Sequence, residues 1–448
     1  MPQNTAILGG GMLGLELARK LRTAGDTVTV FEAAPHLGGL AAAWRLGDIT
    51  WDKHYHVVLL SDLNTQALLA DLGLKDDFVG VTTKTGFYTD GRLYSMSNSV
   101  EFLRFPPLGL VSKLRLGGTI FLASRIKDWK RLESIPVADW LRKWSGRRTF
   151  DRIWLPLLRS KLGEGYRQTS AAFIWATIAR MYAARRSGLK KEVFGYVRGG
   201  YARVLARFAE VLADAGVTVR TDAAVESVTR QSDSVRVTLA DGEAHDFDRV
   251  VLTAPTHVVS KLVPQLTPSE HARLNAVKYQ GIVCASVLLK KPLERFYVMN
   301  ITEGWVPFTA VIEMSALVDP AEFAGHSLVY LPKYVAPDDP IFDEPDDSIR
   351  ARFVAALAKM YPHFAPADVL AFRVSRVRSV FALSTLNYST TVPPMATSLP
   401  GVFVVNSAQI VNGTLNVNET LAQAAAAATA LAEVREPVGV PHVAEALL

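Results

Sequence analysis

A short glycine-rich segment between a strand and a helix restricts the fold of this chain more than any other feature. Thr5–Leu8 predicts a strand, and the sequence Gly-Gly-Gly-Met-Leu-Gly follows it at positions 9–14. Leucines at helical spacing then predict a helix that ends near Gly25, and Thr27–Phe31 predicts a second strand. A strand, a helix and a strand in such close succession form a β-α-β unit, so we expect parallel strands and an α/β fold.

The spacing of the glycines indicates a dinucleotide site at this unit. Gly9 permits the tight turn out of the strand, Gly11 lets the backbone approach a pyrophosphate, and Gly14 allows the helix to pack closely on the strand. Glu32 ends the second strand, where a carboxylate accepts hydrogen bonds from both hydroxyls of a ribose. The same carboxylate would repel a 2′-phosphate, which argues against NADP.

A second glycine pair extends the motif and gives it a family resemblance. Gly38 and Gly39 follow Glu32 after six residues. Together these elements resemble the FAD-binding superfamily that includes flavin amine oxidases, protoporphyrinogen oxidases, phytoene desaturases and UDP-galactopyranose mutases. An Arg usually follows the glycine pair in that superfamily, whereas this chain has Leu40. The resemblance covers essentially the whole chain and implies FAD as the cofactor.

The resemblance also implies cofactor contacts far along the chain. Val225 falls where the family touches the adenine through its backbone. The segment GVFVVNSAQ resembles the strand and loop that meet the ribityl chain, with the neutral pair Asn406-Ser407 in place of the usual acidic residue. The helix predicted over 420–433 would point its N-terminus at the flavin, near Asn416.

The order of the predicted elements suggests two domains. Residues 1–80, 195–270 and 390–448 are expected to form one Rossmann-like FAD-binding domain of the glutathione-reductase type. Residues 81–194 and 271–389 are expected to form an inserted substrate domain, with helices over 101–191 and strands over 276–335 and 370–382. The fold class is therefore α/β in the cofactor domain and α+β overall.

Two departures from the family pattern bear on the substrate. Amine oxidases of the superfamily often place a lysine near flavin N5, and Cys284 occupies the matching position here. They also hold the amine between two aromatic rings. Tyr388 would supply one ring, but the second position falls on Asn416. Tyr388 and Asn416 are thus the candidate substrate contacts, and a simple amine oxidase is disfavoured.

His56 is the candidate catalytic residue. It aligns with a histidine that the resembling mutases keep beside the flavin, where it would exchange a proton or hydrogen-bond the reduced ring. The alternative is that His54 and His56 are ordinary strand residues, with one side chain facing outward. A single cysteine and scattered histidines give no metal-ligand spacing, so no metal is expected.

One segment of the chain is strongly basic. Residues 101–191 contain 20 Lys or Arg against 6 Asp or Glu, although the whole chain carries only +6, and they hold five of the eight tryptophans. Three explanations remain open. The segment is a solvated helical face, a membrane-surface patch that admits a lipid-like substrate, or a site for a phosphate of the substrate, such as a polyprenyl phosphate or nucleotide sugar. The sequence contains no nucleic-acid-binding module.

The sequence therefore predicts an FAD-dependent oxidoreductase. A bulky, lipid-like or glycolipid-like small molecule, isoprenoid or phosphorylated, would give a hydride to flavin N5. The alternatives are a non-redox mutase resembling UDP-galactopyranose mutase and a non-enzymatic binding protein resembling the Rab GDP-dissociation inhibitors. No apolar run reaches the ~20 residues of a membrane span, and one thiol excludes an internal disulfide. A cytoplasmic location follows, with peripheral membrane contact through residues 101–191 as the alternative.

Overall fold

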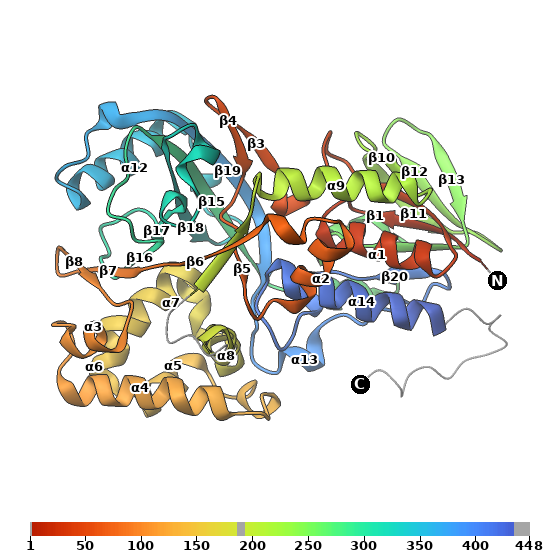
Figure 1. The fold of residues 1–448 in the computed structure, drawn as a ribbon. Coiled ribbons are helices and arrows are strands. Elements are labelled where there is room, and N and C mark those ends of the chain that lie inside the picture. The colour runs from red at the N-terminus through yellow and green to blue at the C-terminus, as the bar shows by residue number, and fades with distance from the viewer. Residues whose placement is uncertain (1, 186–192, 434–448) are drawn as a thin grey trace.

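A five-stranded parallel sheet organises one half of the protein (Figure 1). The computed structural model describes residues 2–185 and 193–433, so residues 434–448 of the predicted cofactor domain lie outside the described residues. The strands of this sheet come from three separated parts of the chain, in the order β10 (Thr218–Arg220), β2 (Thr27–Phe31), β1 (Asn4–Leu8), β14 (Arg249–Leu252) and β20 (Val402–Val404).

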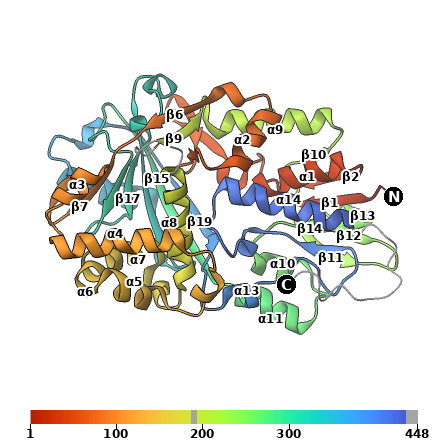
Figure 2. The ribbon, with the colours of Figure 1, turned by 60° about the horizontal axis from the view of Figure 1, so that its bottom comes forward.

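The two faces of this sheet are covered differently. Ile7 of β1 packs into a core formed with three helices that lie side by side in Figure 1, namely α1 (Met12–Thr23), α9 (Gly200–Asp214) and α14 (Val417–Glu433). Ala6 and Leu8 point the other way, because side chains alternate along a strand. They meet a second core, which lies on the opposite side in Figure 2 and is built from β11 (Val225–Arg230), β12 (Val235–Leu239), β13 (Ala244–Phe247), α10 (Thr256–Leu262) and α11 (Pro268–Ala276).

A seven-stranded mixed sheet organises the other half. Its order is β19 (Val369–Ala382), β15 (Tyr279–Leu289), β18 (Ser327–Val335), β17 (Ala310–Glu313), β16 (Val298–Ile301), β7 (Thr85–Thr89) and β8 (Arg92–Ser95). Every residue of β15 is buried, since β15 lies between two long partners and has a core on each face. Helix α12 (Asp346–Met360) packs into one of these cores.

The predicted helical segment is a layer of short helices beside the seven-stranded sheet (Figure 1). It contains α3 (Ser99–Arg104), α4 (Leu110–Arg125), α5 (Val137–Ser145), α6 (Arg147–Thr149), α7 (Leu155–Leu162) and α8 (Ala171–Arg185), with one π-helical turn over Phe150–Trp154. Trp140, Leu141, Phe150 and Leu162 are buried in the core between these helices. The helices expected over 101–191 are therefore present as far as residue 185, and residues 186–191 lie outside the described residues.

Short elements join the two halves. They are the hairpin of β3 (Ala43–Leu46) and β4 (Ile49–Asp52), the sheet of β5 (Val58–Leu59), β9 (Val193–Val197) and β6 (Phe78–Thr82), and helices α2 (Leu63–Asp71) and α13 (Tyr388–Thr391). The expected domain boundaries at 80/81 and 194/195 both fall inside paired strands, because β6 pairs antiparallel with β9. The chain thus leaves the first half near residue 80 and returns to it near residue 195 through this small sheet.

Candidate active site

One cavity of about 900 Å³ runs from the glycine-rich segment to the face of the seven-stranded sheet. At the first end it is lined by Gly9, Gly11, Glu32, Gly38 and Gly39. At the other end it is lined by aromatic and aliphatic side chains, among them Phe173, Tyr279, Ile282, Tyr297, Tyr334, Val377 and Phe381. The cavity therefore joins a polar backbone-lined end to an apolar end.

The glycines of the loop lie where the backbone is tightly packed or borders the cavity. Gly9 has φ +123°, and a Cβ on it would lie 2.3 Å from Thr253 Oγ1. A Cβ on Gly14 would lie 1.9 Å from the Gly9 carbonyl oxygen, so only glycine lets α1 approach β1 this closely. A Cβ on Gly11 would meet nothing within 4 Å, because Gly11 borders the cavity. The N-terminus of α1 thus opens toward a space that a pyrophosphate would fill.

Glu32 is held in place at the end of β2. One of its carboxylate oxygens accepts a hydrogen bond from the Gly10 N–H (2.7 Å), and the other accepts from the Ala34 N–H (2.9 Å). Gly38 reaches the same loop, since its N–H donates to the Gly10 carbonyl oxygen (2.8 Å). The carboxylate lines the cavity with its orientation fixed, as a ribose acceptor requires.

The expected distal contacts divide into two groups. Val225, Ser407 and Asn416 line the same cavity as the glycine loop. Asn406 does not, because its side chain is buried and used within the protein: Nδ2 donates to the Ala254 carbonyl oxygen (2.9 Å) and Oδ1 accepts from the Ala408 N–H (3.0 Å). Asn406 therefore shapes the loop that presents Ser407.

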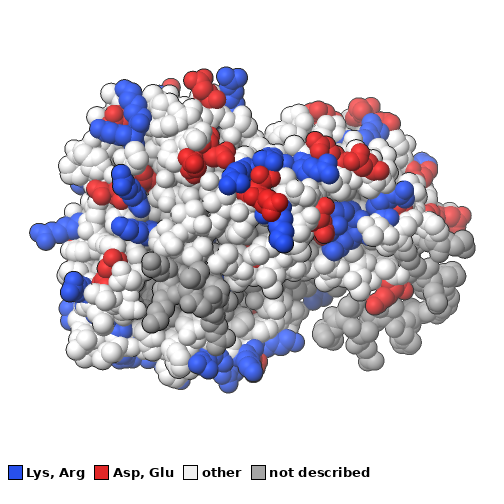
Figure 3. Space-filling view, viewed as in Figure 1, with Lys and Arg blue, Asp and Glu red and all other residues white. Residues whose placement is uncertain are grey.

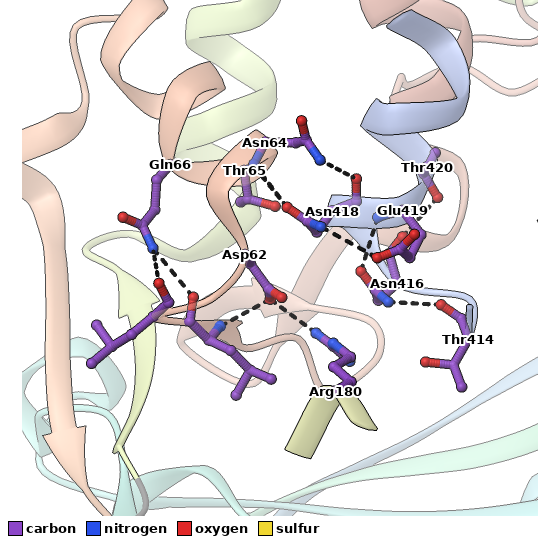
Figure 4. Close-up of polar contacts among 12 residues, drawn as sticks. Asp62, Asn64, Thr65, Gln66, Arg180, Thr414, Asn416, Asn418, Glu419 and Thr420 are labelled. Atoms are coloured by element: carbon purple, nitrogen blue, oxygen red, sulfur yellow. Dashed lines mark hydrogen bonds and ion pairs between the residues drawn. The ribbon is translucent and has the colours of Figure 1, made fainter. Parts of the chain in front are cut away.

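Asn416 begins the last helix, as Figure 4 shows. Its Oδ1 accepts from the Glu419 N–H (3.1 Å), which caps α14, and its Nδ2 donates to the Thr414 carbonyl oxygen (2.7 Å). Both ends of the amide are thus engaged inside the loop, although Asn416, Val417 and Thr420 line the cavity. The residues at the N-terminus of α14 thus border the cavity, while the Asn416 amide is used within its own loop.

The first turn of α14 contacts the start of α2, and Asp62, which precedes α2, contacts α8 (Figure 4). Asn418 Oδ1 accepts from the N–H groups of Asn64 (2.8 Å) and Thr65 (3.3 Å) and so caps α2 from another element. Asp62 accepts from the Leu59 N–H and from Arg180 Nη2, each at 2.9 Å. Arg180, on α8, lines the cavity, so this network positions part of the cavity wall.

Both histidines of the candidate pair line the cavity. His54 lies between the Leu40 carbonyl oxygen (3.2 Å from Nδ1) and Ser375 Oγ (3.1 Å from Nε2), and burial lowers its pKa to about 4. His56 Nδ1 is buried without a hydrogen bond, 3.5 Å from Asp52 Oδ2. Asp52 is itself fixed, because its Oδ1 accepts from the Tyr201 N–H (2.8 Å). Neither side chain faces outward, contrary to the alternative for these two residues.

Two further expectations receive no geometric support. Tyr388 is buried away from the cavity lining, and its hydroxyl donates to the Ala408 carbonyl oxygen (2.7 Å), so the expected substrate contact is replaced by a structural one. Cys284 lies on β15 with no exposed surface, and burial raises the pKa of its thiol far above the ordinary value. Cys284 does not line the cavity, whereas Ile282 on the same strand does.

Sequence reasoning missed two cations that line the cavity, Lys161 and Arg180. Lys161 Nζ lies 3.5 Å from the centre of the Tyr334 ring, and burial lowers its pKa to about 7. Arg180 Nε is buried without a hydrogen bond, although its Nη2 contacts Asp62. Both belong to the basic segment 101–191, but nothing local distinguishes them from its surface cations.

Comparison with known proteins shows which family has a sequence similar to this chain. The model of the family described as flavin containing amine oxidoreductase matches residues 14–432. A 15-cis-phytoene desaturase of Solanum lycopersicum is 24% identical over 297 residues, which cover 59% of this chain and 48% of that protein. A coproporphyrinogen III oxidase of Mycobacterium tuberculosis is 28% identical over 292 residues, which cover 60% and 63%. The chain thus matches less than two thirds of the length of either relative.

A solved structure supports the same assignment at the level of the fold. Putrescine oxidase bound to putrescine superposes with a TM-score of 0.75 at 19% identity, covering 96% of this chain and 99% of that chain. The residues around the cavity fit FAD, since the glycine loop leaves open space at Gly11 and Glu32 is aimed at the cavity. With its match over residues 14–432, the chain belongs to the family of flavin-containing amine oxidoreductases, whose cofactor is FAD.

Proposed function

We propose that this protein is an FAD-dependent oxidoreductase that oxidises a bulky, largely apolar molecule. The observation that carries the proposal is the single cavity that joins the glycine loop to the aromatic surface over β15, β18 and β19. The relatives named as a desaturase and an oxidase support a reaction that removes hydrogen from a C–H or C–N bond. The division into a discontinuous cofactor domain and an inserted substrate domain, and a cytoplasmic location, are parts of the same proposal.

Different residues along the cavity would contact different parts of the cofactor and the substrate. Gly11 and the N-terminus of α1 would hold the pyrophosphate, Glu32 the ribose hydroxyls, Val225 the adenine, and Ser407 with the start of α14 the flavin end. When bound, FAD supplies a hydride acceptor at N5. Tyr279, Tyr297, Tyr334 and Phe381 exclude water and orient an apolar substrate.

His56 is the residue that we propose to hold or move a proton in this cavity. Its imidazole stands over the Tyr201 ring, with 5.0 Å between the ring centres, and beside the fixed carboxylate of Asp52. Asp52 would orient the ring, since its Oδ2 lies 3.5 Å from His56 Nδ1. His54 serves differently, because its low pKa keeps it neutral near pH 7 and its two hydrogen bonds join Leu40 to Ser375.

The decisive experiment starts from the purified protein. We expect a flavin absorption spectrum, anaerobic bleaching by a compound that mass spectrometry identifies among co-purified molecules, and a product that has lost two hydrogens. A product that is an isomer of the substrate, formed only after dithionite reduction, would instead support the mutase alternative. A colourless protein that fails to bind added FAD would overturn the proposal.

Glu32→Gln should weaken FAD binding by about tenfold to a hundredfold, because a charge-assisted pair of ribose contacts is replaced by weaker ones. Titration of the apoprotein with FAD, followed by quenching of flavin fluorescence, measures the change. Glu210→Gln is the control, since Glu210 lies exposed on α9 and pairs with Arg207 (2.8 Å). Equal affinities for FAD in both variants would remove Glu32 from the cofactor site.

We also propose that the surface of α3, α4 and α5 contacts an anionic membrane. Seven large apolar side chains with exposures of 41–71% lie there: Val100, Leu103, Leu110, Val111, Leu114, Phe121 and Trp144. Among exposed charged residues over 103–148, ten are Lys or Arg and two are Asp. Blue atoms accordingly gather along the lower edge of Figure 3, where α4 lies in Figure 1. Exposed apolar residues ringed by cations suit a lipid surface.

None of the helices in residues 2–185 and 193–433 has the length and apolarity needed to span a bilayer. The double variant Val111→Glu/Leu114→Glu should reduce co-sedimentation with phosphatidylglycerol vesicles by about tenfold, since both side chains are exposed on α4. Leu370→Glu is the control, because Leu370 is exposed on β19. Equal binding of all three proteins, or none by the unaltered protein, would leave the patch as a solvated face.

A further inference from the structure

Lys161 is placed in the apolar end of the cavity by α7. Its Nζ lies 3.5 Å from the centre of the Tyr334 ring on β18 and 5.3 Å from that of Phe381 on β19. The Tyr334 hydroxyl is hydrogen-bonded to the Tyr55 hydroxyl (2.7 Å). The amine therefore stands among aromatic side chains, at the end of the cavity that we assign to the substrate.

No anion of the protein compensates this amine within the described residues. Burial alone lowers its pKa to about 7, with no contribution from a neighbouring carboxylate. Lys113, another buried lysine, differs because its Nζ donates to the Leu103 carbonyl oxygen (2.6 Å) and does not line the cavity. A cation removed from water without an anion is costly, and aromatic faces offset only part of that cost.

The other charged and titratable groups that line the cavity are already engaged or neutral. Glu32 accepts from the backbone of the glycine loop, Arg180 is paired with Asp62, and His54 is neutral near pH 7. His56 stands beside Asp52, and burial raises the pKa of the Tyr55, Tyr279 and Tyr334 hydroxyls, which keeps them protonated. Among the described residues lining the cavity, Lys161 is thus the cation that has no carboxylate partner.

We propose that Lys161 binds an anionic oxygen group of the substrate, a carboxylate or a phosphate, and so selects acidic apolar molecules over neutral and cationic ones. The inference rests on the proposed function, since it places the substrate in this cavity. The bound anion would form an ion pair with the Lys161 amine. The aromatic rings around the amine would pack against the apolar part of the substrate.

The test uses the FAD-loaded protein and four matched probes: octanoate, octyl phosphate, octanamide and octylamine. Binding is measured by calorimetry and by the perturbation of the flavin absorption band. We expect octanoate or octyl phosphate to bind at least about tenfold more tightly than octanamide, which has the shape of octanoate without its charge. The stronger of the two anions identifies the group as carboxylate or phosphate.

Two variants assign the preference to the amine. Lys161→Met should remove the preference for anions, whereas Lys161→Arg should keep most of it, because the guanidinium retains the charge. Lys359→Met is the matched control, since Lys359 also stacks on an aromatic ring (3.9 Å from the centre of Trp305) but is exposed on α12. A preference that survives Lys161→Met would overturn the proposal.

The pH dependence of octanoate binding tests the proposal in the unaltered protein, without a variant that removes the charge of Lys161. The amine is charged below its pKa, so octanoate binding should weaken as the pH rises through about 7. Lys161→Arg should abolish this decline, because arginine stays charged throughout the range. A decline that persists in Lys161→Arg, or no anion preference in an unaltered protein that binds FAD, would refute the inference while leaving the proposed function intact. Failure to bind FAD would refute both.

Discussion

Gly14→Ala should abolish FAD binding and destabilise the apoprotein by about 3 kcal/mol, because the new methyl group has no space. Its Cβ would stand 1.9 Å from the Gly9 carbonyl oxygen, and a backbone atom cannot move aside as a flexible side chain can. Helix α1 would have to shift away from β1, carrying the N–H groups of Met12 and Leu13 out of the cavity wall. Thermal unfolding of the apoprotein and FAD titration measure the two effects separately.

Gly117→Ala is the matched control for this substitution. Gly117 also lies inside a helix, α4, and a Cβ there would meet nothing within 4 Å. The change should leave FAD binding unaltered and stabilise the protein by about 0.5–1 kcal/mol, since alanine is the better helix former. If Gly14→Ala behaves like Gly117→Ala, the close packing of α1 on β1 is not what fixes the phosphate end of the site.

The cofactor half of the cavity could be predicted because its signals are local. The turn after β1, the acid at the end of β2 and the glycine pair at 38–39 all lie within one stretch of chain, where spacing alone determines which groups face the ligand. The helix over 420–433 was predictable from its composition and is present as α14. The family membership and FAD implied by these motifs are confirmed.

The substrate half could not be predicted because it is assembled from distant elements. Lys161 belongs to a run of basic residues, and only the packing of α7 on β18 and β19 separates it from the surface cations. Asn416 and Asn418 illustrate the opposite case. Their amides look available in the sequence, but in the fold they cap α14 and α2. Tyr388 is likewise directed to Ala408 by contacts that no local pattern reveals.

One buried ion pair links the three parts of the chain that supply the five-stranded sheet. Arg249, at the start of β14, contacts the Asp26 carboxylate, and the exposures of the two side chains are 3% and 0%. Its Nε donates to Thr5 Oγ1 on β1 (2.9 Å), and its Nη1 donates to the Leu431 carbonyl oxygen on α14 (2.8 Å). One guanidinium therefore ties together the N-terminal, middle and C-terminal parts.

Arg249→Met should destabilise the protein by about 3–5 kcal/mol, because it removes the guanidinium charge that faces the buried Asp26 carboxylate. The double variant Asp26→Leu/Arg249→Met should recover most of that loss, since a pair of apolar residues removes the buried charge as well as the ion pair. Arg236→Met, which breaks an Arg–Asp pair with both side chains 46% exposed, should leave the urea midpoint almost unchanged, because water already solvates both charges. Urea unfolding of the FAD-loaded and apo forms measures all three. If the double variant is no more stable than Arg249→Met, the loss comes from the contacts with Thr5 and Leu431 rather than from the buried charge.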